Sequence, residues 1–549
     1  MSFDPVTLEI CWNRLIGVVN EQAAALQRTS FTSIVREAGD LSAGVFDRRG
    51  FMVAQAVTGT PGHINSMALA MKHFLAACPL ETLRPGDVLI TNDPWLTSGH
   101  LNDVTICSPV FRGDECVAFF ASTCHTADIG GHVLSAEARE VYEEGLQIPI
   151  LKLYEAGRPN AALVAMIRAN VRLPDMVLGD FHAQIAGGAV GGERLLEFMA
   201  EFGLERLEPL ADEIIGRTER ALREAIRALR PGVYEHAITS DGFDEPITIR
   251  ARCEVRGDEL RIDYAGSSPA SRRGVNVVMN YTEAYTTYGV KVIVSPEVPN
   301  NEGAFRPLRI TAPEGSVLNV GRPAAVAARH VIGHFLPHVV AGALGQALPD
   351  RVMAEGSANI WGIQVSGRDL AGAPFTYVTF CSGGTGARAT KDGLSATAFP
   401  SGVLGTPVEV LEQLSPLVVE RKGLREGSGG AGRYRGGLGQ TIAFARAHAR
   451  AVRVLDPRRP HAHARGRLPR RRPGRARPRP DRRRGAAESQ GRAARRPRCP
   501  RRGAPAGRRR VRPARAARSR ARGARPPGGL RPESMTRRTD SRAPEDEGA

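Results

Sequence analysis

The 549-residue sequence has no run of 18 apolar residues, and this absence sets the first limit on its class. A helix that crosses a bilayer needs about 20 consecutive apolar residues, so no membrane span is expected. The Ala-rich stretch 323–347 is interrupted by Arg329, three histidines and Pro337. The opening Met-Ser-Phe-Asp-Pro also lacks the basic segment and apolar run of a secretory signal peptide, so none is expected.

Cysteine is scarce as well. The eight cysteines are scattered along the chain, with no CxxC pair and no regular spacing. A small disulfide-stapled protein would show the opposite pattern, many cysteines at short spacings. We therefore expect reduced thiols in a cytoplasmic protein.

One part of the chain lacks aromatic residues, isoleucine and lysine altogether. Residues 451–549 contain no Phe, Tyr, Trp, Ile or Lys, but they hold 33 Arg, 14 Pro and only 8 acidic residues, a net charge of +25. Residues 1–450 hold 42 basic and 49 acidic residues, a net charge of −7. The formal charge of +18 therefore does not describe the body of the protein, which is mildly acidic, as an ordinary soluble enzyme is.

The composition of residues 447–549 predicts a disordered basic tail, because so little apolar surface cannot offset the conformational entropy of the chain. Two interpretations of this tail compete. A genuine basic arm would bind nucleic acid. A sequence rich in Arg, Ala, Pro and Gly but without Lys is also produced when a GC-rich gene is translated out of frame. The abrupt change near Ala447–Arg453 favours the second interpretation, so nucleic-acid binding is not expected.

Helical and strand periodicities alternate along the body, which indicates a mixed α+β, multi-domain fold. Helices are predicted over 5–29 (with Asp4 as N-cap), 63–78, 159–170, 174–229 (broken at the glycines 187–192), 279–293 and 323–347. Strands are predicted over 44–55 (a hairpin that turns at Asp47–Gly50), 88–91, 103–110, 116–123, 234–240, 247–255 and 260–264. The change of texture at Pro231-Gly232 predicts an N-terminal domain, 1–230, and a β-rich and glycine-rich second domain, 231–446.

The densest cluster of polar chemistry lies in residues 36–132, and each of its histidine or aspartate groups borders a predicted strand. Two histidines with two carboxylates suit one divalent transition metal, Zn²⁺, Mn²⁺ or Fe²⁺, which could activate water or polarise a carbonyl. An H-x-x-D pair alone also arises by chance, so spacing leaves this metal site a hypothesis. The segments are Arg36-Glu37-Ala38-Gly39-Asp40, Thr91-Asn92-Asp93-Pro94, Ser98-Gly99-His100-Leu101-Asn102-Asp103 and His125-Thr126-Ala127-Asp128-Ile129-Gly130-Gly131-His132.

These motifs, in this order, resemble the hydantoinase B/oxoprolinase family. The resemblance covers residues 4–445, and such an ordered string of motifs is highly specific. It also rests on Asp4-Pro5-Val6-Thr7-Leu8-Glu9-Ile10, Glu144-Gly145-Leu146-Gln147-Ile148-Pro149, Asp263-Tyr264-Ala265-Gly266-Ser267, Pro299-Asn300-Asn301-Glu302-Gly303, Gly383-Gly384-Thr385-Gly386-Ala387 and Gly436-Gly437-Leu438-Gly439-Gln440. Family members continue past the last motif with folded sequence, and the Arg-rich tail departs from that pattern.

The resemblance implies the metal-bearing subunit of an ATP-dependent hydrolase that opens cyclic amides such as hydantoins, 5-oxoproline or lactams. It implies a hetero-oligomer with a hydantoinase A-type partner, which uses ATP to phosphorylate the substrate oxygen. It implies that this chain holds the metal on Asp40, His100, Asp103 and His125. The sequence has no G-x-x-x-x-G-K-[ST] phosphate loop, in agreement with ATP on the partner.

Two alternatives to the hydrolase stay open at this point. The family also includes subunits that carboxylate acetone or acetophenone, so an alpha-type subunit of an ATP-dependent ketone carboxylase is the first alternative. A basic nucleic-acid-binding protein that acts through the tail is the second.

Several further residues are candidates for the site. Arg329 matches an arginine of the family and could hold a phosphorylated or anionic substrate, His132 could act as a proton shuttle, and His63 could line the pocket. The three histidines at i, i+4 and i+8 of the helix predicted over 323–347 share one face, which could ligate a metal but fits a polar helix face or a subunit contact better. They are His330, His334 and His338. The glycine-rich stretch 383–393 could present N–H groups to an anion, although tight turns fit it better.

Overall fold

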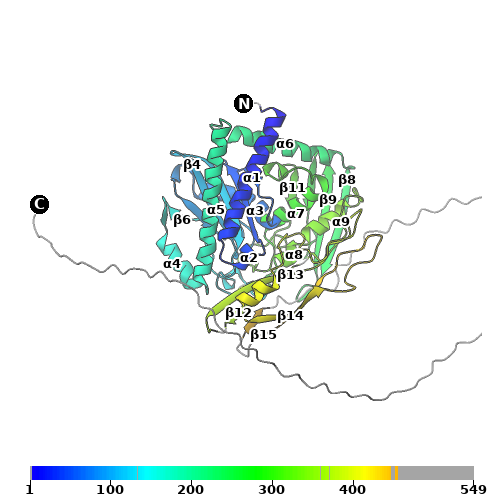
Figure 1. Cartoon of the computed structure of the whole chain (residues 1–549). Coiled ribbons are helices and arrows are strands. Elements are labelled where there is room, and N and C mark those ends of the chain that lie inside the picture. Colours follow the sequence, from blue (N-terminus) through cyan, green and yellow to red (C-terminus); the bar gives the residue numbers. More distant parts are fainter. Residues whose placement is uncertain (1–2, 133, 359, 370, 447–451, 456–549) are drawn as a thin grey trace, which may run out of the picture. The chain divides into compact units, whose positions relative to one another are not determined.

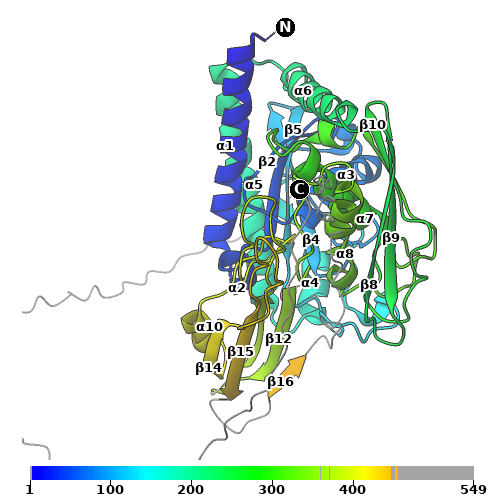
Figure 2. The same ribbon diagram turned by 90° about the vertical axis from the view of Figure 1, so that its right-hand side faces the viewer.

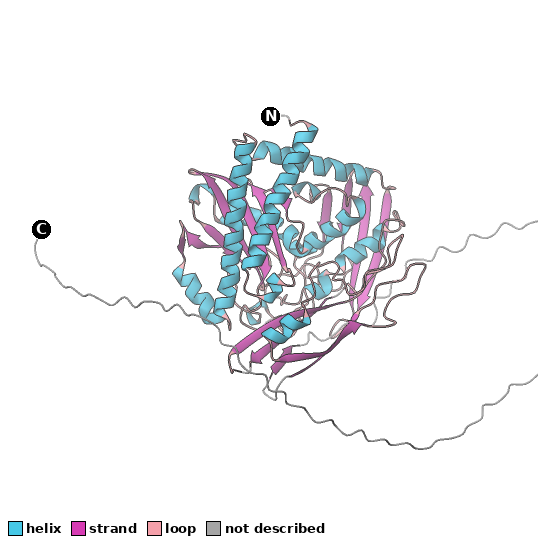
Figure 3. Cartoon of the chain, viewed as in Figure 1, coloured by secondary structure: helices cyan, strands magenta, loops and turns pink. Residues whose placement is uncertain are grey.

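A computed structural model describes residues 3–132, 134–358, 360–369, 371–446 and 452–455. All of them belong to one compact unit. Helices and strands are both abundant (Figures 1 and 3), so the mixed α+β class is confirmed. Among the described residues, no helix is long and apolar enough to cross a membrane. The domain boundary predicted near 230 falls between the last helix of the first half and the first strand of a second sheet, and the division into two domains stays a prediction.

A seven-stranded antiparallel sheet dominates the first half of the body. Its order is β2-β1-β5-β4-β3-β6-β7, and β4 and β5 form its long central hairpin. The strands are β1 (Leu41–Asp47), β2 (Met52–Gln55), β3 (Val88–Thr91), β4 (Asp103–Arg112), β5 (Glu115–His125), β6 (Leu151–Glu155) and β7 (Arg158–Pro159). Successive side chains of β5 point to opposite faces, so Phe119 and Phe120 enter two different hydrophobic cores.

Helices cover both faces of this sheet. They are α1 (Pro5–Thr29), α2 (Ser33–Arg36), α3 (Pro61–Ala77), α4 (Ala161–Asn170), α5 (Pro174–Glu201) and α6 (Glu208–Arg227). The Phe120 face packs against α1 and α5, which lie side by side (Figures 1 and 2), and the Phe119 face packs against α3. The predicted N-cap of α1 is confirmed, because the side chain of Asp4 accepts hydrogen bonds from the backbone N–H groups of Val6 and Thr7.

The prediction that the long helix breaks at the glycines 187–192 is wrong. The helix α5 runs through them, and the chain leaves the helical conformation only between Glu201 and Glu208. A Cβ atom on Gly187 would lie 2.9 Å from the Gln22 carbonyl oxygen of α1, and one on Gly191 would lie 2.5 Å from the Phe120 ring. These glycines therefore serve the close approach of α5 to its neighbours and do not interrupt the helix.

The second half of the body contains a four-stranded sheet with the order β11-β10-β9-β8. Its elements are β8 (Gly232–Ser240), β9 (Ile247–Arg256), β10 (Glu259–Asp263), α7 (Met279–Val294), β11 (Leu308–Thr311), α8 (His330–Gly333) and α9 (Leu336–Leu344). A large core joins this sheet to α7 and α9. The single helix predicted over 323–347 is wrong: residues 323–329 are not helical, and the remainder forms two short helices. Pro337 in the first turn of α9 cannot donate the backbone hydrogen bond that a continuous helix needs.

The last described elements form two small sheets, β13-β12-β16 and β14-β15. They consist of β12 (Ile360–Arg368), β13 (Pro374–Ser382), α10 (Val408–Leu414), β14 (Leu417–Leu424), β15 (Gln440–Arg446) and β16 (Val452–Leu455). The strand β16, which pairs with β12 (Figure 2), lies inside the predicted tail and was not foreseen. Its sequence, Val-Arg-Val-Leu, holds three of the few aliphatic residues of the tail and suits a short strand. The rest of the tail, 447–451 and 456–549, lies outside the described residues.

Candidate metal centre

Three strand ends bring the predicted ligands together. In the sheet, β5 lies between β1 and β4 and is antiparallel to both. The start of β1, the end of β5 and the start of β4 therefore lie side by side at one end of these strands. Asp40 directly precedes β1, His125 ends β5, and Asp103 begins β4 opposite His125. The backbone N–H of His125 donates to the carbonyl of Asp40 over 3.1 Å, which fixes this alignment.

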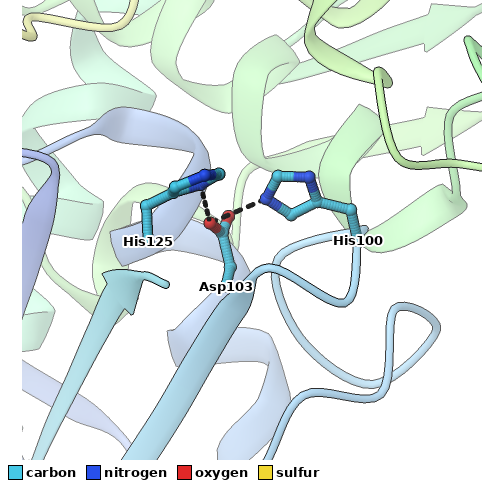
Figure 4. A group of neighbouring side chains, drawn as sticks. All are labelled: His100, Asp103 and His125. Atoms are coloured by element: carbon cyan, nitrogen blue, oxygen red, sulfur yellow. Dashed lines mark hydrogen bonds and ion pairs between the residues drawn. The ribbon is translucent and has the colours of Figure 1, made fainter. Parts of the chain in front are cut away.

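The fourth predicted ligand, His100, comes from the loop that leads into β4. Figure 4 shows His100 and His125 on either side of the Asp103 carboxylate. Oδ1 of Asp103 lies 2.7 Å from Nε2 of His100 and 3.0 Å from Nδ1 of His125. One ligand atom from each of the three residues lies within 4.8 Å of the others, and all three side chains are buried. This is the geometry of side chains that share one small ligand.

Asp40 and His63 lie beside this trio. Oδ2 of Asp40 is 4.0 Å from Nδ1 of His125, and Oδ1 of Asp40 accepts a hydrogen bond from the hydroxyl of Thr60. Nε2 of His63 lies 2.8 Å from Oδ2 of Asp103 and 3.8 Å from Oδ1 of Asp40. The structure thus places His63 against two of the predicted ligands. The sequence alone could place it only in the wall of the pocket, because nothing in the Pro-Gly-His segment that begins α3 indicates a carboxylate partner.

Arg329 is engaged inside the cluster. Its guanidinium donates to Oδ2 of Asp103 and to the carbonyl of Ser98, and it lies 4.1 Å from the centre of the Tyr281 ring. The residue is 3% exposed. From the sequence, this arginine is a candidate to hold a phosphorylated or anionic substrate. In the structure, its charge is paired with a carboxylate of the protein. Such a bond fixes the orientation of the carboxylate, which His63, His100 and His125 also face.

The charges of the cluster depend on one another. Burial disfavours the ionised carboxylate of Asp103, but His100, His63 and Arg329 hold its pKa well below the usual range. Burial disfavours a charged His63 ring, yet the carboxylates of Asp103 and Asp40 raise its pKa above the ordinary value. Burial and the charge of Arg329 lower the pKa of His100 to about 4, so this imidazole is neutral at physiological pH.

The orientation of His100 tests whether a metal ion fits. Its Nδ1 lies 2.8 Å from the carbonyl oxygen of Ala327, which can only accept, so Nδ1 carries the proton. Nε2 of the neutral ring then turns a lone pair toward Oδ1 of Asp103, and it has no hydrogen-bond partner among the described residues. Two acceptors 2.7 Å apart repel each other unless a cation lies beside both. Nε2 of His125 is likewise buried without a partner in the described part of the chain. A divalent transition metal therefore suits this set of donors.

The other candidates lie outside this trio. His132 is exposed, and its backbone N–H donates to Glu143, so the structure does not bring it into the cluster. The three histidines of the predicted helix are buried on and between α8 and α9, with the rings of His330 and His334 5.7 Å apart. Burial lowers the pKa of His334 to about 3 and that of His338 to about 4, so both rings are neutral. Among the described residues, these histidines form no group of three metal-ligating atoms.

The glycine-rich stretch 383–393 is packed against other backbone. A Cβ atom on Gly386 would lie 1.7 Å from the carbonyl oxygen of Ala354, and one on Gly384 would lie 2.0 Å from that of Gly437. Only glycine allows these approaches. The stretch therefore serves tight packing, which agrees with the simpler of its two interpretations.

The family follows from a comparison with known proteins. A model of the family hydantoinase B/oxoprolinase matches residues 4–467. The chain belongs to this family. The family match runs past Ala447–Arg453, where the sequence text changes, and it includes the strand β16. The pairing of β16 with β12 places Val452–Leu455 within the folded body.

One sequence relative and two solved structures show what the chain is similar to. The chain is 31% identical to the caprolactamase subunit beta of Pseudomonas jessenii over 459 residues, which are 80% of this chain and 78% of the relative. The crystal structure of the ATP-dependent caprolactamase from Pseudomonas jessenii matches with a TM-score of 0.76 and 28% identity, over 81% of this chain and 79% of that one. A nucleotide-free structure of acetone carboxylase matches with a TM-score of 0.75 over 82% of this chain and 63% of that one. Its identity of 21% shows a shared fold alone.

Family motifs outside the trio build the walls of the site in this member. Oδ1 of Asn92, in the Asn-Asp-Pro motif, accepts the backbone N–H of Ile148, in the Glu-Gly-Leu-Gln-Ile-Pro motif. The side-chain amide of Asn92 donates to the carbonyls of Leu101 and Leu146. One buried asparagine thus ties the loop that bears His100 to a segment about fifty positions further along the chain.

Proposed function

We propose that this chain is the metal-bearing subunit of an ATP-dependent hydrolase of cyclic amides, such as hydantoins, 5-oxoproline or lactams. The observation that carries the proposal is the convergence of His100, Asp103 and His125, with Asp40 beside them, around buried and unpartnered imidazole nitrogens. These four residues would hold one Zn²⁺, Mn²⁺ or Fe²⁺ ion. Membership of the hydantoinase B/oxoprolinase family and the likeness to a caprolactamase support a lactam-like substrate.

When bound, a divalent ion at these residues would polarise a substrate oxygen or activate water for attack on the amide carbon. The residues of the chain prepare the site for this chemistry. Arg329 and His63 hold Oδ2 of Asp103 from two sides, so the carboxylate stays ionised and keeps one orientation. The neutral ring of His100 presents Nε2, because the carbonyl of Ala327 holds the proton on Nδ1.

Exclusion of water is the second contribution of the protein. His100 is 1% exposed, His125 4% and Asp103 0%. In such a site, charges interact more strongly than in bulk water, and a reactive intermediate is protected from side reactions. His63 can hold a proton on Nε2 beside both carboxylates without leaving its hydrogen-bonding position.

ATP chemistry belongs to a partner in this proposal. The chain has no phosphate-loop motif, and its relative is named as a subunit of a caprolactamase. An amide carbonyl is a poor electrophile. A hydantoinase A-type partner that phosphorylates the carbonyl oxygen would supply a better leaving group before the ring is opened. The active species would then be a cytoplasmic hetero-oligomer.

The metal assignment is tested by elemental analysis of the purified full chain. About one divalent transition metal per chain is expected, and the double substitution His100→Ala with His125→Ala should abolish it. A matched double substitution, His73→Ala with His182→Ala, removes two histidines outside the cluster and should retain the metal. Equal metal content in all three proteins would refute the ligand assignment.

The division of labour is tested by activity. The isolated chain should neither hydrolyse ATP nor open a cyclic amide, and both activities should arise when a hydantoinase A-type partner is added. Robust ATP turnover by this chain alone would refute the proposed role of the partner. Incorporation of labelled bicarbonate into a ketone, in place of ring opening, would instead support the ketone carboxylase alternative.

A further inference from the structure

One short segment from the second half of the sequence, residues 325–329, fixes the side chains of two residues of the cluster, His100 and Asp103. The carbonyl of Ala327 accepts the Nδ1 proton of His100 over 2.8 Å, and two positions later the guanidinium of Arg329 pairs with Asp103. The segment 325–329 was expected to be helical, but residues 325 and 326 carry no regular structure, residues 327–329 form a turn, and α8 follows. Its backbone N–H groups therefore need partners other than the carbonyls of a helix.

Glu144 accepts two of these N–H groups, while that of Ala328 donates to the Gly274 carbonyl and that of Arg329 to the Val326 carbonyl. Its Oε1 accepts the backbone N–H of Val326 over 2.6 Å and that of Ala327 over 2.7 Å. The side chain is 1% exposed, and its second oxygen, Oε2, has no partner among the described residues. One carboxyl oxygen of Glu144 thus accepts hydrogen bonds from the buried N–H groups of Val326 and Ala327. The carbonyl of the same Ala327 orients His100.

Glu144 is itself anchored to the loop that follows His125. A Cβ atom on Gly131 would lie 2.4 Å from the carbonyl carbon of Glu144, so these two backbones are in close contact. The backbone N–H of Leu146 donates to the carbonyl of Ile129 over 2.8 Å. The side chain of Glu144 therefore connects the loop after β5, which carries one ligand, with the segment that orients another.

We propose that Glu144 is a positioning residue of the metal centre: its Oε1 fixes the backbone of Val326 and Ala327, and the Ala327 carbonyl then keeps Nε2 of His100 directed at the cluster. This inference rests on the proposed metal-bearing function. Residues that orient a ligand from behind commonly change metal affinity by about 10- to 100-fold when they are lost. Glu144 acts here through hydrogen-bond acceptance, and its negative charge is not required.

If Glu144 acts as a hydrogen-bond acceptor, three substitutions at this position should have different effects. Glu144→Gln keeps an oxygen at the position of Oε1 and should preserve the site. Glu144→Ala leaves two buried N–H groups without an acceptor, and Glu144→Asp shortens the side chain, so its oxygen cannot reach both N–H groups well. Asp87 provides the matched control. It is a buried carboxylate that accepts the backbone N–H groups of Arg84 and Ala156, each over 2.8 Å, and it precedes β3 at the end remote from Asn92.

The experiment uses the full chain with two independent readouts. The first is the ¹⁵N spectrum of the histidine rings in metal-free protein, with the His100 signal assigned from a His100→Ala variant. Wild type and Glu144→Gln should show His100 protonated on Nδ1, whereas Glu144→Ala and, to a smaller extent, Glu144→Asp should show a mixture of tautomers. The second is the affinity for Zn²⁺, measured by calorimetry, which should fall about 10- to 100-fold in Glu144→Ala and stay near wild type in Asp87→Ala.

The two readouts keep this inference separate from the proposed function. Wild-type protein that binds no Zn²⁺ would count against the metal-bearing function, while the tautomer of His100 would still decide the role of Glu144. A Glu144→Ala protein with the wild-type His100 signal and wild-type affinity would overturn the inference. If Glu144→Ala does not fold, the same measurements on Glu144→Asp decide, and an unchanged His100 signal in that variant would equally overturn it.

Discussion

Asp103 and Arg329 form a buried ion pair between residues 226 positions apart in the sequence. The two side chains are 0% and 4% exposed, so neither charge is compensated by bulk water. Each depends on the other: Arg329 helps His100 and His63 to keep Asp103 ionised, and Asp103 is the only carboxylate among the described residues that lies within ion-pair distance of this guanidinium. The pair joins the first sheet to the segment before α8.

This pair predicts a strong energetic coupling. Loss of one partner from a buried ion pair costs about 3–5 kcal/mol, because the other charge is left buried and unpaired. Asp103→Ala and Arg329→Met should each destabilise metal-free protein by roughly this amount, and the double variant should lose clearly less than the total of the two. Urea unfolding of the four proteins in the presence of a chelator measures the cycle. Additive losses would show that the two side chains are energetically independent.

The carboxyl of Glu144 predicts a dependence of stability on pH. Burial raises its pKa from the ordinary value of about 4.5 to about 8, against the lowering effect of the Ala327 and Val326 N–H groups. Because the folded protein binds this proton more tightly than the unfolded chain, the contribution is fully present below about pH 4.5 and is lost as the pH rises through 8. Glu144→Gln removes this contribution. The stability of wild type relative to Glu144→Gln should therefore fall between pH 5 and pH 8.5, measured as urea midpoints.

The same comparison contains its own control. All other titrating groups are shared by the two proteins, so their effects cancel in the difference. A constant difference across this pH range would mean that the carboxyl of Glu144 is ionised in the folded protein throughout, and the raised pKa would be wrong.

Much of the fold was accessible from local sequence. The helix over 5–29, the strand over 88–91 and the β4–β5 hairpin lie where the periodicity placed them, because their burial patterns are set within each element. Two predictions, at the glycines 187–192 and over 323–347, were wrong. Phe120 and α1 occupy the space beside the glycines, so these residues serve close packing. Over 323–347, Pro337 interrupts the helical hydrogen bonds, and the distant Glu144 accepts the N–H groups of Val326 and Ala327.

The site divides in the same way. Histidines and aspartates that border predicted strands could be recognised as candidates, because antiparallel neighbours bring such ends to one edge. The roles of His63, Arg329 and Glu144 depend on contacts across the whole body, and no local pattern encodes them. For Glu144, the sequence offered one indication of a role, because this residue begins the family motif Glu-Gly-Leu-Gln-Ile-Pro.

The glycines of α5 predict a second test of packing. Gly191→Ala would place a Cβ atom 2.5 Å from the Phe120 ring, so α5 or β5 must shift, and a loss of about 1–3 kcal/mol is expected. Gly17→Ala in α1 is the matched control, because a Cβ atom there meets nothing within 4 Å. That substitution should stabilise the protein by about 0.5–1 kcal/mol through helix propensity alone. Thermal unfolding of both variants decides, and two changes of the same sign would contradict the packing argument.

The strand β16 predicts where the chain can be shortened. Residues Val452–Leu455 pair with residues 364–367 of β12, whose other edge is occupied by β13. A chain that ends at Arg446 would leave this part of β12 as an open edge, with unpaired N–H and C=O groups that invite aggregation. A chain that ends at Leu455 keeps the pairing, and the composition of 456–549 offers few aliphatic and no aromatic side chains to a core. The Leu455 chain should therefore match the full chain in melting temperature and solubility, whereas the Arg446 chain should melt lower and aggregate more readily. Equal behaviour of the two shortened chains would show that β16 adds nothing to the body, and a Leu455 chain that is less stable than the full protein would assign a structural role to residues beyond it.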